Sequence, residues 1–349
     1  MNNPFPNTSN FLVLQQIEFD EQIFFSPPTI QDFETEDAFM RVIRNKEFRR
    51  PKGEHIHEFI EEFLLLTLGD KWLQEQKQLP FENCHEIIKW IKYKKDFFKS
   101  ANQNYGRGDM VYPNGYTKEL FSLAADIYYL NLVGKIPKEL LNRLKLKDQF
   151  RGARYEIGIA AAFIRSGFRI EWLKQTKNKK NHEFDVVHKF TNEKIAIEAK
   201  KLNRNETAQS NLLEHGGTEL DIFRNYNQAL EQNPRDRPFG VFIDIDLPHF
   251  RPEHSFFWKE SLFDLYLQKK VKMFDYSGKR FSVEECPPPS FLVITNSAWH
   301  YEQENRAGKG ENSIIFRKKA KFPIKNLVTM QAIEKAVRSF GKLPTDTLM

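Results

Sequence analysis

Apolar residues in the first part of the chain recur every three or four positions, which is the spacing of an amphipathic helix. The pattern predicts one helix over Glu54–Trp72 and a second that begins at Asn83, a residue type that caps helices well. A third helix is predicted from Thr117 to about Leu132, and Pro137 suits the first turn of a fourth. We therefore expect residues 1–150 to form a mostly helical N-terminal domain.

The pattern changes after Phe150, where short apolar runs alternate with helical segments. The predicted elements are, in chain order, a helix at 154–165, strands at 168–173, 183–188 and 195–199, a helix at 220–232 and a strand at 239–245. A further strand at 291–295 and a helix at 324–340 form a C-terminal extension. This order predicts an α/β domain over 151–349 with an αβββαβ core.

The composition excludes several classes of protein. The chain has 349 residues, a pI near 9.0 and a mean hydropathy of -0.60. No apolar run reaches the roughly 18 residues that a membrane span needs. The first ten residues lack the basic and apolar regions of a secretory signal, and two cysteines, Cys84 and Cys286, cannot form a disulfide framework. We expect a globular, cytoplasmic protein without a membrane partner.

The charge is unevenly distributed along the chain. Residues 1–150 carry 20 basic and 22 acidic side chains, whereas residues 151–349 carry 33 and 25. Between Arg143 and Arg204 the numbers are 16 and 7, a local excess of 9 positive charges. Such an excess is typical of a surface that binds phosphate groups, although a solvated lysine-rich face has the same composition.

Two acidic residues and a lysine lie on neighbouring predicted strands. If the hairpin turns tightly at Thr191-Asn192, Asp185 faces Glu198 directly across the strands, and Lys200 projects from the same face. Like charges opposite each other destabilise a sheet, so a hard divalent cation such as Mg²⁺ would relieve the repulsion. Two carboxylates and a lysine on one edge suit the hydrolysis of a phosphodiester.

Two structural interpretations of the same residues stay open at this stage. In the same register Glu183 pairs with Lys200, which makes a salt-bridged outer face of a sheet with no catalytic role. A turn centred on Asn192-Glu193 would instead place Asp185 opposite Lys200, which is also an ordinary ion pair.

The arrangement resembles the PD-(D/E)XK nuclease superfamily, whose members share the restriction endonuclease-like fold. Their core runs helix, three strands, helix, strand, with an aspartate on the second strand and Glu-x-Lys on the third. Asp185 and Glu198-Ala199-Lys200 match these positions, and Glu156 matches an acidic residue that many members carry on the preceding helix. The resemblance covers about 151–247, and Phe184 stands where the motif has proline.

The resemblance implies a metal-dependent nuclease of the restriction or phage-defence type that cuts DNA with Mg²⁺ or Mn²⁺. Asp185 and Glu198 would bind the metal, and Lys200 would be the catalytic lysine. Glu156 would take part in catalysis by orienting water or supporting a second cation. DNA is expected because the family mostly cuts DNA; the residues do not exclude RNA. A homodimer would serve the cutting of both strands, and an operon-encoded partner protein is a further expectation.

Basic residues near these motifs are candidates for contacts with the nucleic-acid backbone. Four precede the Asp185 strand, two lead into the core helix and one follows Lys200: Lys174, Lys177, Lys179, Lys180, Arg151, Arg154 and Lys201. Contacts of this kind are independent of base sequence and strongly salt-dependent. The alternative function is a non-catalytic module that keeps this fold to bind nucleic acid or a partner protein.

Overall fold

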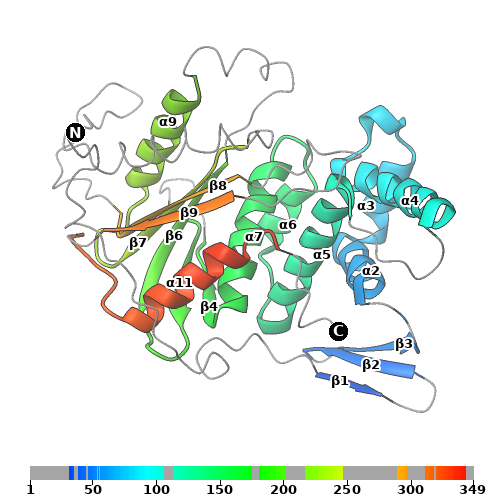
Figure 1. Ribbon diagram of the computed structural model, residues 1–349, viewed down its shortest axis with the longest axis horizontal. Coiled ribbons are helices and arrows are strands. Elements are labelled where there is room, and N and C mark those ends of the chain that lie inside the picture. Colours follow the sequence, from blue (N-terminus) through cyan, green and yellow to red (C-terminus); the bar gives the residue numbers. More distant parts are fainter. Residues whose placement is uncertain are drawn as a thin grey trace.

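The chain folds into a mixed α/β structure with two sheets and several layers of helices (Figure 1). The computed structural model describes residues 31–34, 38–44, 46–52, 54, 56–105, 113–174, 181–201, 217–246, 289–296, 311–317 and 320–342. A three-stranded sheet precedes the helices of the first half, and a six-stranded sheet organises the second half.

Helices dominate the first half, as predicted, but a small antiparallel sheet comes before them. Its strands are β1 (Gln31–Glu34), β2 (Ala38–Ile43) and β3 (Lys46–Pro51). The helices that follow are α2 (Ile56–Leu68), α3 (Asp70–Lys77), α4 (Glu86–Tyr105), α5 (Gly115–Val133) and α6 (Lys138–Leu144). The sheet was not predicted from the sequence because β3 reads KEFRRP, which is mostly charged and lacks an apolar face.

The ends of these helices show which capping signals operate. Asn114 caps α5, because its side chain accepts a hydrogen bond from the Thr117 backbone N–H at 2.9 Å. Asn83 was predicted to cap the second helix, but it does not cap α4. It lies in a short 3₁₀ helix, Phe81–Asn83, and α4 begins only at Glu86.

The second half is built on one mixed sheet. Its elements are α7 (Phe150–Arg165), β4 (Phe168–Trp172), β5 (Phe184–His188), β6 (Lys194–Lys201), α9 (Gly217–Glu231), β7 (Phe239–Asp244), β8 (Phe291–Asn296), β9 (Glu311–Phe316) and α11 (Leu327–Ser339). The strands lie in chain order, with β6, β7 and β8 parallel to one another and the remaining neighbours antiparallel. The predicted order of helix, three strands, helix, strand is confirmed by α7 to β7.

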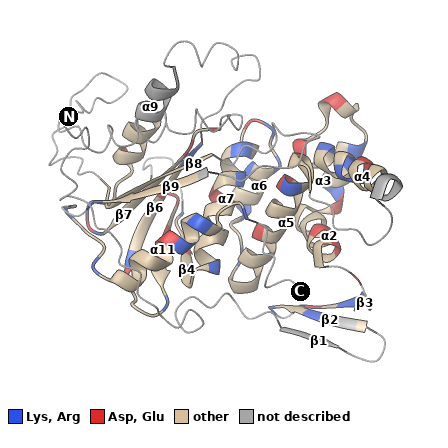
Figure 2. Cartoon of the chain, viewed as in Figure 1, with Lys and Arg blue, Asp and Glu red and all other residues tan. Residues whose placement is uncertain are grey.

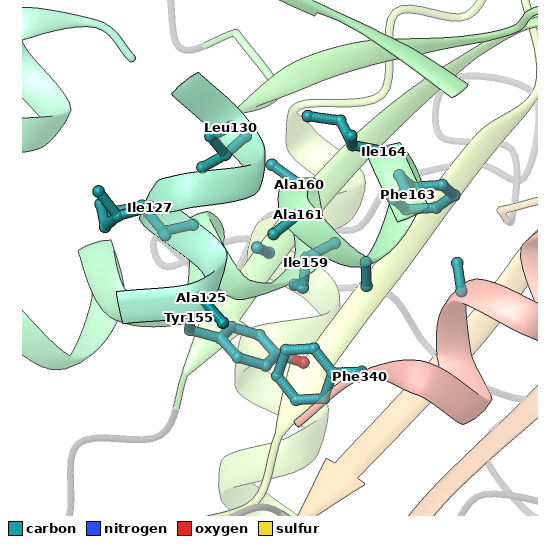
Figure 3. Packing of buried hydrophobic residues seen from close by; sticks show 14 of the residues in the cluster. Ala125, Ile127, Leu130, Tyr155, Ile159, Ala160, Ala161, Phe163, Ile164 and Phe340 are labelled. Carbon is teal, nitrogen blue, oxygen red and sulfur yellow. The ribbon is translucent and has the colours of Figure 1, made fainter. Parts of the chain in front are cut away.

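The two halves share one hydrophobic core. Helix α7 lies between α5 and the sheet, and its small residues, Ala160 and Ala161 among them, let the three layers approach closely (Figure 3). Phe163 on the other side of α7 packs edge-on against Phe168 and Phe242 of the sheet. The apolar cluster runs without a break from α2 to α11, so residues on both sides of position 150 are buried together.

One glycine in the sheet permits this packing. The ring of Phe291 lies over Gly240 on the neighbouring strand, and a Cβ atom at Gly240 would come within 2.2 Å of that ring. We predict that Gly240→Ala lowers the free energy of unfolding in urea by about 1–3 kcal/mol. In Gly152→Ala, where the nearest atom would be 3.8 Å away, no loss is expected because alanine favours the helix. Equal losses in the two variants would contradict this account.

None of the helices in the described ranges combines the length and the apolar character that crossing a membrane requires.

Candidate functional site

The hairpin that carries the candidate residues pairs in a register different from both predicted ones. Asp185 lies opposite Ala196, and Phe184 lies opposite Ile197. The predicted pairing of Asp185 with Glu198 is therefore wrong, and so is the alternative pairing of Asp185 with Lys200. Relative to the first prediction, β6 is displaced by two residues.

The turn explains the displacement. The backbone N–H of His188 donates to the Glu193 carbonyl at 3.0 Å, which closes a four-residue loop where a tight two-residue turn was predicted. Asn192 adopts a left-handed backbone with a φ of 55°, a conformation that asparagine tolerates better than most residues. Because side chains alternate with a period of two, a displacement by two residues keeps every side chain on its face of the sheet.

Asp185, Glu198 and Lys200 thus share one face, as predicted, with Asp185 and Glu198 as diagonal neighbours. Both carboxylates are buried, at 1% and 0% exposure, so the interpretation of this face as an outer, solvated surface is wrong. Phe184 and Ile197 point to the opposite face and lie in the apolar core. Helix α9 contacts β6 and β7, and α7 and α11 lie across the sheet from it in Figure 1.

Glu198 is the most unusual of these residues. Its carboxylate is fully buried, and the Lys200 ammonium pairs with Oε1. Burial raises the pKa of Glu198 to about 7, against the attraction of Lys200. Burial alone would lower the pKa of Lys200, but Glu198, Glu183 and Glu156 raise it, so Lys200 stays protonated.

Two further acidic residues act on Glu198. Glu183 directly precedes β5, and burial followed by repulsion from Glu156 and Glu198 raises its pKa well above the usual range. Glu156 is held by Arg143 of α6, whose two terminal nitrogens donate to its oxygens at 2.8 and 2.5 Å. The site is therefore a cluster of three glutamates with two cations. Sequence reasoning missed the roles of Glu183 and Arg143 here, because only the fold brings α6 against α7 and Glu183 close to Glu156.

Asp185 has a different environment within the same face. Burial raises the pKa of Asp185, but hydrogen bonds from His182 and Lys194 outweigh it, so the net pKa is below the usual value. His182 Nε2 lies 2.7 Å from Oδ1 and Lys194 Nζ lies 3.1 Å from Oδ2, while Arg237 Nε is 3.4 Å from Oδ1. Asp185 is therefore ionised and fully surrounded by nitrogen donors.

No family model, curated protein or solved structure matches this chain.

The carboxylate oxygens of this site meet part of what the binding of a divalent cation requires. Glu198 offers two buried carboxylate oxygens, one of them paired with the Lys200 ammonium, beside two other carboxylates, and such oxygens are the ligands that a hard cation prefers. Asp185 would have to exchange nitrogen donors for the metal. Within the described residues no group of three or more acidic, histidine or cysteine side chains is arranged closely enough to hold an ion as it stands.

The basic residues predicted to contact nucleic acid lie in different surroundings. Lys174 is exposed just after β4, at the sheet end where Glu183 lies, whereas Lys177, Lys179 and Lys180 lie outside the described residues. Three others form ion pairs inside the protein: Arg151 with Glu86 and Asp246, Arg154 with Asp126 and Glu119, and Lys201 with Asp244 and Asp246. Figure 2 shows acidic and basic residues interspersed over the helices of the chain. A nucleic-acid role for these three stays a prediction.

The raised pKa of Glu198 predicts a distinctive pH dependence of stability. Between the ordinary value of 4.5 and the folded value of about 7 the unfolded state loses its proton first, so ionisation destabilises the fold as pH rises. Glutamine has no charge to lose. We predict that the stability of Glu198→Gln relative to the wild type increases between pH 4 and pH 8 by on the order of 3 kcal/mol, measured by urea unfolding. A difference in unfolding free energy between the two proteins that stays constant across this range would show that the fold does not raise the pKa of Glu198.

Proposed function

We propose that the chain is a metal-dependent nuclease that hydrolyses phosphodiester bonds at the face carrying Asp185, Glu198 and Lys200. The observation that supports this most is Glu198, a fully buried carboxylate with a raised pKa that is paired with Lys200 and has other glutamates close by. Such an arrangement costs stability and is typical of functional sites.

The residues that would hold the metal are Glu198 and Asp185, with Glu156 and Glu183 beside them. A bound divalent cation would act as a Lewis acid on the phosphoryl group and lower the pKa of the attacking water. Its charge would also offset the repulsion that raises the pKa of Glu198 and Glu183. Binding would require the nitrogen donors around Asp185, among them His182 and Lys194, to move away from its oxygens.

Lys200 would act by its charge. Because its pKa is raised, it cannot accept a proton at neutral pH and is unsuited to be the general base. Its ammonium group, 17% exposed and next to Glu198, can instead hold the attacking water or neutralise charge on the pentacovalent phosphorus. The Arg143 side chain is one third exposed at the same cluster and would hold Glu156 in place while presenting positive charge to a phosphate.

The proposed substrate is DNA. The basic excess between Arg143 and Arg204 and the exposed Lys174 favour a polyanion. The choice of DNA over RNA, the restriction or phage-defence role, and a homodimer or an operon-encoded partner follow from the superfamily resemblance alone.

A second function is favoured by one observation. The Asp185 carboxylate is already hydrogen-bonded by His182 and paired with the cations Lys194 and Arg237, so this part of the site is satisfied without a metal. That arrangement suits a non-catalytic module that binds nucleic acid or a partner protein on the same fold.

Cutting assays separate the two functions. Supercoiled plasmid, single-stranded DNA and single-stranded RNA would be incubated with the protein in Mg²⁺, Mn²⁺ or EDTA. The proposal predicts metal-dependent cutting by the wild type and its loss in Asp185→Asn. Salt-sensitive binding of nucleic acid without cutting in any metal, unchanged in Asp185→Asn, would support the binding module instead.

A further inference from the structure

A groove on the N-terminal half, remote in sequence from the candidate site, has the composition of a docking surface. It has a volume of about 640 Å³ and is bordered by the β2–β3 hairpin, α2 and α5. We call it the hairpin groove. Its lining residues are Ile43, Arg44, Lys46, Phe48, Phe63, Leu66, Thr67, Asn131 and Lys135. None of them belongs to the glutamate cluster or to the surroundings of Asp185.

The floor of the hairpin groove is apolar and built on packed aromatic rings. Ile43 and Phe63 are buried at 5% and 8% exposure, and the α2 residue Leu66, at 52%, is one of the most exposed large apolar side chains in the described part of the chain. Phe48 packs edge-on against Phe63, with ring centroids 5.8 Å apart, and Phe63 packs in the same way against Tyr128. These rings fix the shape of the floor.

The charged residues of the groove all have the same sign. Arg44, Lys46 and Lys135 contribute the charges, and no acidic side chain is among the lining residues. All three are exposed. An apolar floor bordered only by cations is complementary to a partner that is apolar on one side and negatively charged at its edges.

We propose that the hairpin groove binds an amphipathic helix of a partner protein, with apolar residues at i, i+3 or i+4 and i+7 that contact Leu66 and Phe63, flanked by Asp or Glu that face Arg44, Lys46 and Lys135. Apolar grooves of this kind bind helices through anchors at that spacing.

A peptide fits these features better than a nucleic acid does. Single-stranded nucleic acids need flat aromatic faces on which bases can stack. The rings of Phe48 and Phe63 are engaged edge-on with one another and with Tyr128, and Phe63 is almost entirely buried. The exposed apolar surface is that of Leu66, an aliphatic side chain, which suits the apolar face of a helix.

Selection from a displayed peptide library tests the proposal. Random peptides of about 14 residues, roughly four helical turns, would be panned against the immobilised full-length protein. We expect enriched peptides with apolar residues at helical spacing and flanking Asp or Glu. Their affinity, measured by fluorescence anisotropy, should fall at least about tenfold in Leu66→Glu and in Lys46→Glu.

A matched variant distinguishes the groove from general surface effects. Leu146, which follows α6 and does not line the groove, is 47% exposed, so Leu146→Glu introduces the same charge at a similar leucine and should leave peptide binding unchanged. The proposal is overturned if no peptide depends on Leu66, or if the enriched peptides carry no acidic residues. It is also overturned if a single-stranded oligonucleotide, and no peptide, loses binding in Leu66→Glu. None of these results bears on cutting, because the groove shares no residue with the candidate site.

Discussion

Lys200→Ala is expected to reduce phosphodiester cleavage by about 10²–10³-fold, the usual cost of removing one charge-stabilising group from an active site. The reason is that Lys200 stays protonated beside Glu198 and can offset negative charge that develops on the phosphoryl group. The rate would be measured under single-turnover conditions in Mg²⁺ and in Mn²⁺, with the nucleic acid that the wild type cuts best.

The loss must be separated from an effect on folding. Without Lys200, Glu198 loses the cation that pairs with it, and its pKa is expected to rise further because burial then acts with less opposition. Circular dichroism and urea unfolding of the variant would be recorded at the pH of the assay. Lys138→Ala, which removes an exposed lysine of α6, should cut at the wild-type rate. Full activity in Lys200→Ala would exclude the proposed role.

Arg154→Ala is expected to lower the free energy of unfolding by about 3–5 kcal/mol, the cost of leaving buried charges without their partner. Arg154 donates to Asp126 Oδ2 at 2.8 Å and to Ser122 Oγ at 2.9 Å, and it lies 3.9 Å from Glu119. Asp126 is 3% exposed, and burial already raises its pKa against the pull of Arg154 and Arg165. Removing Arg154 would leave Asp126 dependent on Arg165 alone, 3.6 Å away.

An exposed ion pair provides the comparison. Arg338 pairs with Glu334 one turn away on α11 and is 74% exposed, so Arg338→Ala should cost only about 0.3–0.5 kcal/mol. Arg154→Ala would also show how this arginine is used. A folded, stable Arg154→Ala that binds nucleic acid weakly would mean that Arg154 serves as a backbone contact, as its sequence position suggested, and that the buried pair contributes little.

The sequence was informative wherever one segment determines its own environment. The strands β5, β6 and β7 are short apolar runs, and the helix α7 combines small residues with an apolar stripe, so their type and order could be predicted. The shared face of Asp185, Glu198 and Lys200 could also be predicted, because alternation along a strand does not depend on the partner.

The register could not be predicted, because it depends on the turn. The sequence Thr191-Asn192 suggested a tight two-residue turn. The observed loop has four residues, of which Asn192 adopts a left-handed backbone. The Thr191 hydroxyl also forms a hydrogen bond of 2.8 Å with the hydroxyl of Thr329 in α11. That contact joins residues far apart in the chain. Local turn propensity therefore gave a register two residues away from the observed one.

The surroundings of the site could not be predicted from local sequence patterns, because they also depend on contacts between residues far apart in the chain. Arg143 reaches Glu156 from α6, and Arg237 reaches Asp185 from the segment before β7. The basic residues Arg151, Arg154 and Lys201 looked available for phosphate in the sequence, but packing of α7 against α5 and the sheet places them beside buried carboxylates. A count of charges along a chain does not show which of them are paired inside the fold.

The central claim is that the buried Glu198 site hydrolyses phosphodiesters with a divalent cation, and metal-dependent cleavage by the wild type and Glu198→Gln tests it most directly. The wild type is expected to nick or linearise plasmid DNA in Mg²⁺ or Mn²⁺ and not in EDTA, and Mn²⁺ should raise its thermal stability. Glu198→Gln, folded at the assay pH, should neither cut nor gain stability from Mn²⁺. Cleavage by Glu198→Gln at the wild-type rate, or a well-folded wild type that binds DNA but cuts it in neither metal, would contradict the account.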